Sequence, residues 1–405
     1  MNKTPLHLYL AVSGLHDSAA VQNAHRELFE ALNSQYDVAI HNIRELTEAG
    51  SKATLFVATG GVEESIKAAI DKSNVKDITL IADGLQNSLA ASMEVASWLA
   101  TRDIEGRIIH GDIPYILDRV SHMLIKNALN GCRVGQLGEP SGWLISSNVD
   151  YAKVSQEYGI EFVKISLDEI EEEFKTAAPA EVSGIHDLKK VEPTGKDLDL
   201  ALRLTTAIEN VVKRHNLDAF SLKCFDLLKP LDTTGCLALA VLNAKGIPAG
   251  CEGDMPALLT MLLAQRLTGA PGFMANPSRI DSQNNEITIA HCTLPLNMAG
   301  ENILRSHFES GIGVALQGIL PLGSVTVVKW WGAEMNEYFL TAGQLLENLD
   351  NPSMCRTQIR LKLDAPVDYF LTRPLGNHHV ILLGDHTHIL KEFFNLNNVS
   401  DRAAK

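Results

Sequence analysis

Short apolar runs alternate with helix-length amphipathic stretches over the first third of the chain, and this alternation limits the fold more than any other feature. Between about residues 6 and 130 the apolar runs are LHLYLAVS, DVAIHNI, TLFVATGG, ITLIAD and RIIHGD. Strands separated by helices pair in parallel, because each helix carries the chain back to the same edge of the sheet. We therefore expect an N-terminal parallel α/β domain over residues 1–132.

The alternation continues along the chain, so we expect a second, central α/β domain over residues 133–300. Its clearest elements are a long helix from about residue 196 to residue 215 and the strand-like segments AFSLKC, IPAGCE and EITIAHC. A helical run follows each of the first two segments. This predicts parallel strands that end at Cys224 and Glu252, with their carboxyl ends on one side.

Closely spaced strands without intervening helices dominate the chain after about residue 300. The segments are IGVALQG, SVTVVKWWG, EYFLTAG, TQIRLKL, VDYFLT and HHVILLG, and helical spacing returns only in the final DHTHILKEFFN. An antiparallel sheet or small barrel fits this pattern. The expected fold class is thus α/β, with two parallel-sheet α/β domains followed by a β-rich C-terminal domain over residues 301–405.

Acidic residues outnumber basic ones, 49 against 35, and give the 405-residue chain a formal net charge of −14. Binding to phosphates requires a basic surface, so this balance argues against nucleic acid as the main partner. The chain has no run of 18 apolar residues, and its N-terminal apolar stretch is too short for a signal peptide, which predicts a cytoplasmic protein without a membrane partner. Six cysteines without a C-x-x-C pair favour reduced, mostly buried thiols.

The segment 246–261, GIPAGCEGDMPALLTM, is the best candidate for chemistry. It runs an apolar strand into two carboxylates, Glu252 and Asp254, directly before a helix that opens with Pro256. Carboxylates at the carboxyl end of a strand lie in the crevice where open α/β sheets bind ligands. Asp254 is also well placed to cap the helix. Glu252 follows a buried-looking run and needs a metal, a cation or a proton there.

Two further motifs supply partners for these carboxylates. Asp226 follows the strand AFSLKC and precedes Asp254 by one strand-helix-strand unit, which predicts that both lie at one sheet edge. The segment GNHHVILLGDHTH contains the adjacent His378 and His379, which point to opposite faces of a strand, so only one can serve a given site. One imidazole with two carboxylates suits manganese better than magnesium or calcium. His291 ends a third strand and is a candidate substrate contact or proton carrier.

The chain resembles the superfamily of L-fucose isomerase and L-arabinose isomerase in the patches KCFD at 223–226, CEGD at 251–254 and GNHH at 376–379. The resemblance implies a metal-dependent intramolecular oxidoreductase that interconverts an aldose and a ketose through an enediolate, which Mn²⁺ stabilises. It implies that Asp226, Asp254 and His378 hold the metal, with Glu252 as the alternative to Asp226. It also implies a small-molecule sugar substrate and a homo-oligomer.

The expected roles follow from this resemblance. The candidate catalytic residues are Asp254, Glu252 and Asp226, and either Asp254 or Glu252 would move the proton between the two carbons. The candidate substrate contacts are His291, Lys223 and His379. A non-catalytic sugar-binding or regulatory protein of the same fold is the alternative, because two α/β domains that face a cleft also form sugar receptors. That alternative predicts sugar binding that survives chelation of the metal.

Overall fold

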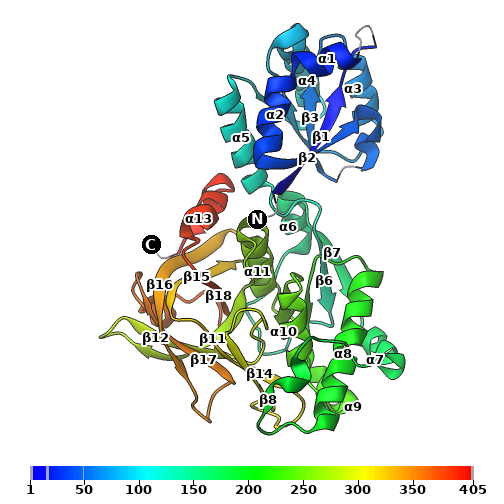
Figure 1. The fold of residues 1–405 in the computed structure, drawn as a ribbon. Helices are drawn as coiled ribbons and strands as arrows, with labels where there is room; N and C mark the ends of the chain where they lie inside the picture. The colour runs from blue at the N-terminus through cyan, green and yellow to red at the C-terminus, as the bar shows by residue number, and fades with distance from the viewer. Residues whose placement is uncertain (1–2, 15–17, 49, 403–405) are drawn as a thin grey trace. The chain divides into compact units, whose positions relative to one another are not determined.

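The computed structural model describes residues 3–14, 18–48 and 50–402 (Figure 1). Its contacts divide the chain into two compact units, Met1–Gly131 and Cys132–Lys405. Within these described ranges, no helix is both long enough and apolar enough to cross a lipid bilayer.

The first unit is a parallel α/β domain. Its strands run in the order β2-β1-β3-β4-β5 with parallel pairings. Helices α3 and α4 pack on one face of the sheet and α2 and α5 on the other, so the sheet is covered on both sides. Its main elements are β1 (Thr4–Ala11), α1 (Ser18–Ala24), α2 (Arg26–Gln35), β2 (Tyr36–Asn42), β3 (Lys52–Val57), α3 (Glu63–Ile70), β4 (Asp77–Ile81), α4 (Ser88–Ala100), β5 (Glu105–Ile109) and α5 (Ile113–Lys126).

The second unit begins with another parallel sheet, whose strand order is β10-β9-β6-β7. Strands β9 and β10 are parallel neighbours, as predicted, with Cys251 opposite Leu222. The predicted long helix is α8 (Gly195–Arg214). The remaining elements are β6 (Arg133–Leu137), α6 (Tyr151–Tyr158), β7 (Glu161–Ile165), α7 (Leu167–Thr176), β8 (Lys189–Lys190), β9 (Ala219–Leu222), η4 (Cys224–Leu227), α9 (Leu228–Leu231), α10 (Cys236–Ala244), β10 (Ala249–Cys251) and α11 (Met255–Thr268).

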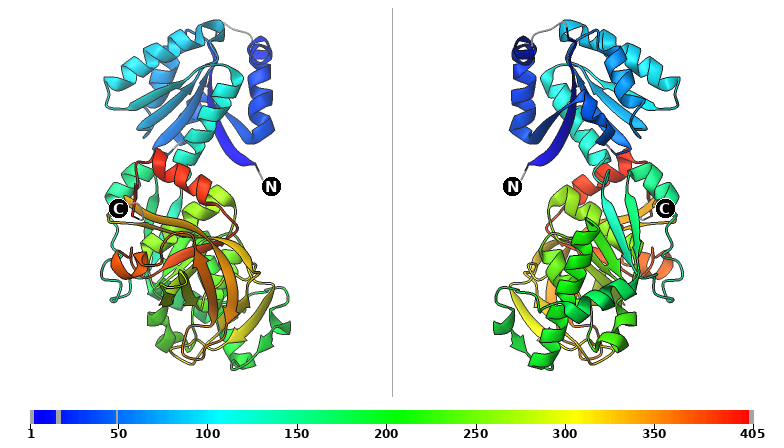
Figure 2. Two further views of the ribbon diagram at one scale, coloured as in Figure 1. Left: turned by 90° about the vertical axis from the view of Figure 1, so that its left-hand side faces the viewer. Right: turned by 90° about the vertical axis from the view of Figure 1, so that its right-hand side faces the viewer.

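An antiparallel barrel completes the second unit, and it confirms the predicted fold class. Strands β15, β18, β11, β12, β17 and β16 are hydrogen-bonded in that order, and β16 pairs again with β15 to close the ring (Figure 2). Strands β11 and β12 therefore belong to the barrel although they precede residue 301. The elements are β11 (Phe273–Asp281), β12 (Glu286–His291), β13 (Glu301–Arg305), β14 (Ala315–Ile319), β15 (Gly323–Trp331), β16 (Glu337–Leu349), β17 (Thr357–Leu363), α12 (Tyr369–Thr372), β18 (His379–Leu383), α13 (Thr387–Leu396) and β19 (Ser400–Asp401).

Helix α11 connects the parallel sheet to the barrel. It packs against β9 and β10 on one side and against β15 and β18 on the other. Its residues from Met255 to Ala264 are buried, which matches a helix that is apolar all round rather than on one stripe. The start of α11 is consequently enclosed by both layers.

One predicted strand is wrong. The segment VDYFLT at residues 367–372 contains the short helix α12 instead. A strand would send the neighbouring side chains of Tyr369 and Phe370 to opposite faces, whereas the helical turn buries both of them. The Thr372 hydroxyl donates to the Asp368 carbonyl oxygen at 2.7 Å and stabilises the turn.

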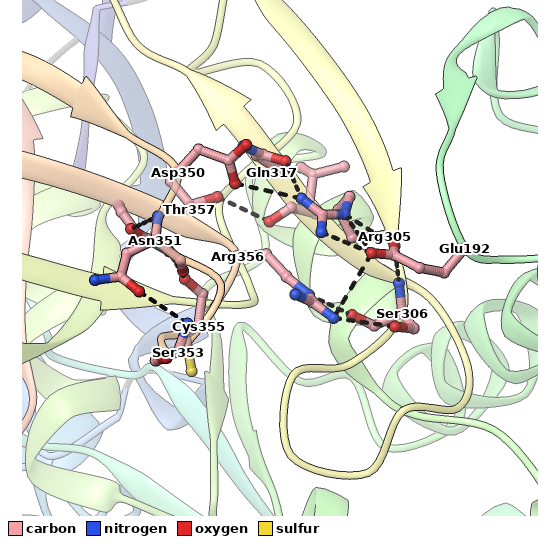
Figure 3. A network of polar contacts seen from close by, with 12 residues as sticks. Glu192, Arg305, Ser306, Gln317, Asp350, Asn351, Ser353, Cys355, Arg356 and Thr357 are labelled. Atoms are coloured by element: carbon pink, nitrogen blue, oxygen red, sulfur yellow. Dashed lines mark hydrogen bonds and ion pairs between the residues drawn. The ribbon is translucent and has the colours of Figure 1, made fainter.

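Ion pairs and hydrogen bonds connect the end of β13 with the segment before β17 (Figure 3). Glu192 accepts from Arg305 Nη2 at 2.6 Å and from the backbone N–H of Ser306 at 3.1 Å. Arg356 donates to the Ser306 carbonyl oxygen at 2.7 Å, and Arg305 donates to Gln317 on β14. These bonds hold the chain on both sides of Ser306 in place.

Candidate functional site

The turn after β10 brings Glu252 to the carboxyl edge of the parallel sheet. Glu252 has a φ of 63° and Gly253 a φ of 74°, both in the left-handed region that favours glycine. A Cβ at Gly253 would lie 2.7 Å from the Cα of Pro140, so the glycine is required. For Glu252 the same region costs about 1 kcal/mol, and such strain concentrates at functional sites.

Glu252, His291 and His378 form a group of the kind that holds a metal ion. One ligand atom from each lies within 4.8 Å of the others, and all three residues are buried. Glu252 Oε1 is 3.6 Å from His378 Nε2, and the two imidazole rings meet edge to face with centroids 5.4 Å apart. His291 Nδ1 is hydrogen-bonded to the Thr293 hydroxyl at 2.8 Å, which leaves Nε2 available. The set combines two imidazole nitrogens with one carboxylate.

His378 is oriented by Asp254. Its Nδ1 lies 2.9 Å from Asp254 Oδ2, and its Nε2 is buried without a hydrogen-bond partner among the residues described. A buried ring nitrogen without a partner is costly, and a metal ion would satisfy it. Asp254 Oδ1 accepts from the Ala257 backbone N–H at 2.8 Å, so the predicted helix cap is confirmed. One carboxylate serves both purposes through its two oxygens.

The charge states of the group suit a cation. Burial alone would raise the pKa of Glu252, but the nearby His378 and His291 outweigh burial and lower it to about 2. Burial also opposes ionisation of Asp254, yet Lys329 and His378 bring its pKa to about 2. Burial lowers the pKa of His291 to about 3, so this imidazole is neutral. The two carboxylates are therefore ionised, and His291 has the lone pair that a metal ligand needs. Burial opposes the protonation of His378, but Asp254 and Glu252 outweigh burial and raise its pKa, so a metal ion at His378 would displace a proton.

Trp143 and Phe225 form an aromatic wall beside Glu252. Trp143 Nε1 donates to Glu252 Oε2 at 2.6 Å, although 54% of Trp143 is exposed. Its ring stands edge to face against Phe225 at 5.0 Å, and Phe225 stands edge to face against His307 at 5.5 Å. A half-exposed indole beside a buried carboxylate offers an apolar surface next to a charged group, as small-molecule sites do.

The structure does not bring the three predicted metal ligands into one group. Asp254 and His378 are in contact, but Asp226 lies in η4 with a side chain that is 51% exposed, and its carboxylate is 2.9 Å from Lys223 Nζ. The carboxylate that reaches His378 Nε2 from this sheet edge is the predicted alternative, Glu252. The reason is the direction of the chain, because η4 turns Asp226 toward Lys223.

His379 lies on the far side of β18 from His378. It is fully buried, its Nε2 is 3.1 Å from the Tyr369 hydroxyl, and its ring contacts Phe339 and Phe370. The alternation of side chains along the strand places His378, and not His379, beside Asp254 and Glu252. The contact of His379 with a substrate stays a prediction.

Sequence reasoning did not find Trp143 and Lys329. Trp143 lies in the loop after β6, more than 100 residues before its partner Glu252, and nothing in the local pattern marks it. Lys329 is a fully buried lysine on β15, 3.7 Å from Asp254 Oδ2. The one available signal was its position in the apolar run SVTVVKWWG, where a charge needs a partner.

The cysteines are free thiols, as predicted, and all except Cys355 are buried. Cys224 Sγ and Cys251 Sγ lie 3.1 Å apart beneath the turn that carries Glu252. In the part of the chain that the structure describes, the group that could hold a metal ion consists of Glu252, His291 and His378 and includes no cysteine.

Comparison with known proteins places the chain near one kind of enzyme. No protein-family model matches it. It is 27% identical over 176 residues to a sulfoquinovose isomerase from Clostridium sp. strain MSTE9, which covers 42% of this chain and 39% of that protein. It is 22% identical over 227 residues to the sulfoquinovose isomerases of Priestia aryabhattai and Priestia megaterium, which covers 53% of this chain and 50% of theirs. The chain thus spans half, or less, of the length of these curated relatives.

Proposed function

We propose that this chain is a metal-dependent aldose–ketose isomerase, an intramolecular oxidoreductase that works through an enediolate. The observation that carries the proposal is the buried group of Glu252, His291 and His378, whose ligand atoms lie within 4.8 Å of one another at the carboxyl edge of a parallel sheet. The similarity to sulfoquinovose isomerases supports the class of reaction. The substrate is a small-molecule sugar.

Glu252, His291 and His378 would hold a divalent ion. The unpartnered Nε2 of His378 and the neutral imidazole of His291 fit this role. Two imidazoles and one carboxylate favour a first-row transition ion over magnesium or calcium, and we propose Mn²⁺. When bound, the ion supplies Lewis acidity, which stabilises the negative charge of an enediolate.

The remaining chemistry is proton transfer between C1 and C2 of the sugar, which we assign to Glu252. Its Oε1 faces His378, whereas Oε2 accepts one hydrogen bond from the half-exposed Trp143 and keeps a second lone pair for the proton. Asp254 is less suited, because its side chain is fully buried, with the Ala257 N–H at Oδ1 and both His378 and Lys329 at Oδ2. We therefore assign Asp254 the orientation of His378.

The substrate would lie against the aromatic wall. Trp143 and Phe225 offer apolar faces. His291 has Nδ1 bonded to Thr293 and Nε2 in the metal group, so we assign it to the ion rather than to the expected contact with the sugar. Lys223 stays a predicted contact at the same sheet edge, with a side chain that is 25% exposed. The homo-oligomer and the cytoplasmic location also stay predictions, and light scattering on the purified protein would test the first of them.

The decisive test combines metal analysis with deuterium exchange. The purified protein is stripped with chelator, reloaded with Mn²⁺ and incubated in D₂O with sulfoquinovose, L-fucose or L-arabinose. We expect ketose formation, with deuterium at the reacting carbon, from at least one sugar and only with metal. Sugar binding that is undiminished in excess chelator, without any product, would contradict the proposal and favour a binding protein.

A further inference from the structure

Strand β15 packs against helix α11 (Figure 1). Lys329 is buried on this strand, and its Nζ faces Asp254, the cap of that helix. The side chain is 0% exposed, and Nζ has no hydrogen-bond partner among the described residues. Its nearest anionic partner is Asp254 Oδ2, at 3.7 Å, and the ring of Trp331 lies 4.9 Å from Nζ. A buried ammonium with so few partners is unfavourable for the fold, and an apolar side chain of the same length would be better tolerated.

The geometry of Asp254 shows what this charge can do. Oδ1 faces the N-terminus of α11 and accepts from Ala257. Oδ2 faces both His378 Nδ1, at 2.9 Å, and Lys329 Nζ, at 3.7 Å. Lys329 therefore concentrates the negative charge of the carboxylate on the oxygen that faces His378.

The loop before His378 is held from the same strand. A Cβ at Gly376 would lie 2.6 Å from Cζ3 of Trp331, so the indole ring lies directly against the backbone of that loop. Lys329 and Trp331 are two residues apart on β15 and share one face of the strand. One strand thus contacts the His378 loop through Trp331 and the Asp254 carboxylate through Lys329.

We propose that Lys329 is a positioning residue for the metal group: through Asp254, it holds the His378 imidazole with Nδ1–H as the donor and Nε2 aimed at Glu252 and His291. Carboxylates that orient metal-ligating histidines are common, and their loss typically weakens metal binding. The assignment of Lys329 behind that carboxylate is specific to this chain, and it rests on the proposed metal site.

The first experiment measures Mn²⁺ affinity by titration calorimetry. Lys329→Met keeps the length of the side chain and removes the charge, and we expect a loss of affinity of about 10-fold to 100-fold. Lys362→Met is the matched control, because Lys362 is an exposed lysine on β17, a barrel strand that does not pair with β15, and this variant should bind Mn²⁺ as the native protein does. Unchanged affinity in Lys329→Met would overturn the proposal.

A double variant separates positioning from space filling. If Lys329 acts through Asp254, Lys329→Met should change nothing once Asp254 is already Asn, so Asp254→Asn and the double variant should have equal Mn²⁺ affinity. The double variant also removes both charges together, which keeps the comparison possible if Lys329→Met alone fails to fold. A further loss of affinity in the double variant would mean that Lys329 acts by another route.

The second experiment needs no metal. In protein labelled with ¹⁵N-histidine, the buried Nδ1–H of His378 should give a slowly exchanging proton signal that is absent from His378→Gln. We expect faster exchange in Lys329→Met and no change in Lys362→Met. If this holds but no metal binds, the proposed function fails and the positioning role stands. If Mn²⁺ binds and the signal is unaffected in Lys329→Met, the positioning role fails and the proposed function stands.

Discussion

Asp254 Oδ2 and His378 Nδ1 lie 2.9 Å apart although 124 residues separate them in the chain. The contact joins the N-terminus of α11 to the loop before β18, so it connects the parallel sheet to the barrel. Both groups are fully buried, so the hydrogen bond is strong, and removing one partner would leave the other buried without a partner and destabilise the fold.

Asp254→Ala should be more damaging than Asp254→Asn. Alanine removes the helix cap, worth about 1 kcal/mol, and leaves Lys329 buried without its anion, for a total of about 3–5 kcal/mol in the free energy of unfolding. Asparagine retains an oxygen for the cap, so its cost should be about 1 kcal/mol smaller. Urea unfolding of the metal-free variants, followed by tryptophan fluorescence, measures the difference. Equal stability of Asp254→Ala and the native protein would contradict this account.

Glu252→Gln and Asp226→Asn decide between the two candidate carboxylates. Glu252 belongs to the group with His291 and His378 that could hold a metal ion, so Glu252→Gln should lose Mn²⁺ affinity by roughly 100-fold. Asp226 is paired with Lys223 outside the group, and its amide variant should stay within about threefold of the native protein. Calorimetric titration with Mn²⁺ provides both numbers. A large loss in Asp226→Asn would restore the ligand set that the family resemblance implied.

Trp143→Phe should lower kcat/KM by about fivefold, because it removes a hydrogen bond to a carboxylate in a half-exposed setting, worth about 1 kcal/mol. Trp143→Ala also removes the apolar face and should raise KM in addition. The control is Trp98→Phe in the first unit, which should leave both constants unchanged. Steady-state kinetics on the sugar identified by deuterium exchange provides the test, and native kinetics in Trp143→Ala would exclude the aromatic wall as a substrate surface.

Acid should destabilise the metal-free protein through His379. Burial lowers the pKa of His379 to about 3, from 6.5 in the unfolded chain. Between these values the unfolded state binds a proton that the folded state does not, so the free energy of unfolding falls as pH decreases, by about 1.4 kcal/mol per pH unit for this residue. His379→Gln should reduce that slope, whereas His388→Gln, at an exposed position on α13, should not. Denaturant titrations from pH 7 to pH 5 measure the slopes, and equal slopes in the native protein and His379→Gln would refute the prediction.

Gly253→Ala tests the turn that presents Glu252. The added Cβ would meet the Cα of Pro140 at 2.7 Å, in addition to the strain of a φ of 74°. Gly269→Ala is the matched control, because Gly269 has a φ of 70° with nothing within 4 Å of its Cβ position. We expect a cost of about 1 kcal/mol for the control and roughly 2 kcal/mol more for Gly253→Ala. Similar thermal stability of the two variants would show that the close contact with Pro140 is not required.

The fold was predictable where apolar periodicity is strong and local. The parallel strands of the first unit, the pairing of β9 with β10 and the helix α8 all follow from runs of the right length and spacing. Prediction failed where local pattern is ambiguous. Residues 367–372 are rich in apolar and aromatic side chains, like a strand, but form α12. Strand β11 was not predicted because Pro277 interrupts it, beside a register shift in its pairing with β12.

The sequence predicted where the site lies, but not which side chains form it. The acidic strand end, the role of Asp254 as a cap and the one-sided use of the His378–His379 pair follow from residue order and from the alternation of side chains along a strand. Which carboxylate faces His378 depends on the left-handed backbone at Glu252, and a glutamate there is an exception that propensity does not predict.

The sequence by itself determined most of the elements, their parallel or antiparallel character and the two motifs that supply Asp254 and His378, because these depend on the spacing of apolar and polar residues along the chain. Only the tertiary structure decided that Glu252 and His291 join His378 in one group and that Asp226 pairs with Lys223 instead. It also decided that Lys329 faces Asp254 and that Trp143 bonds to Glu252. Those relationships depend on the direction of side chains across the junction of sheet and barrel, where residues far apart in the chain approach within a few ångströms. Local preference carries no information about such distances.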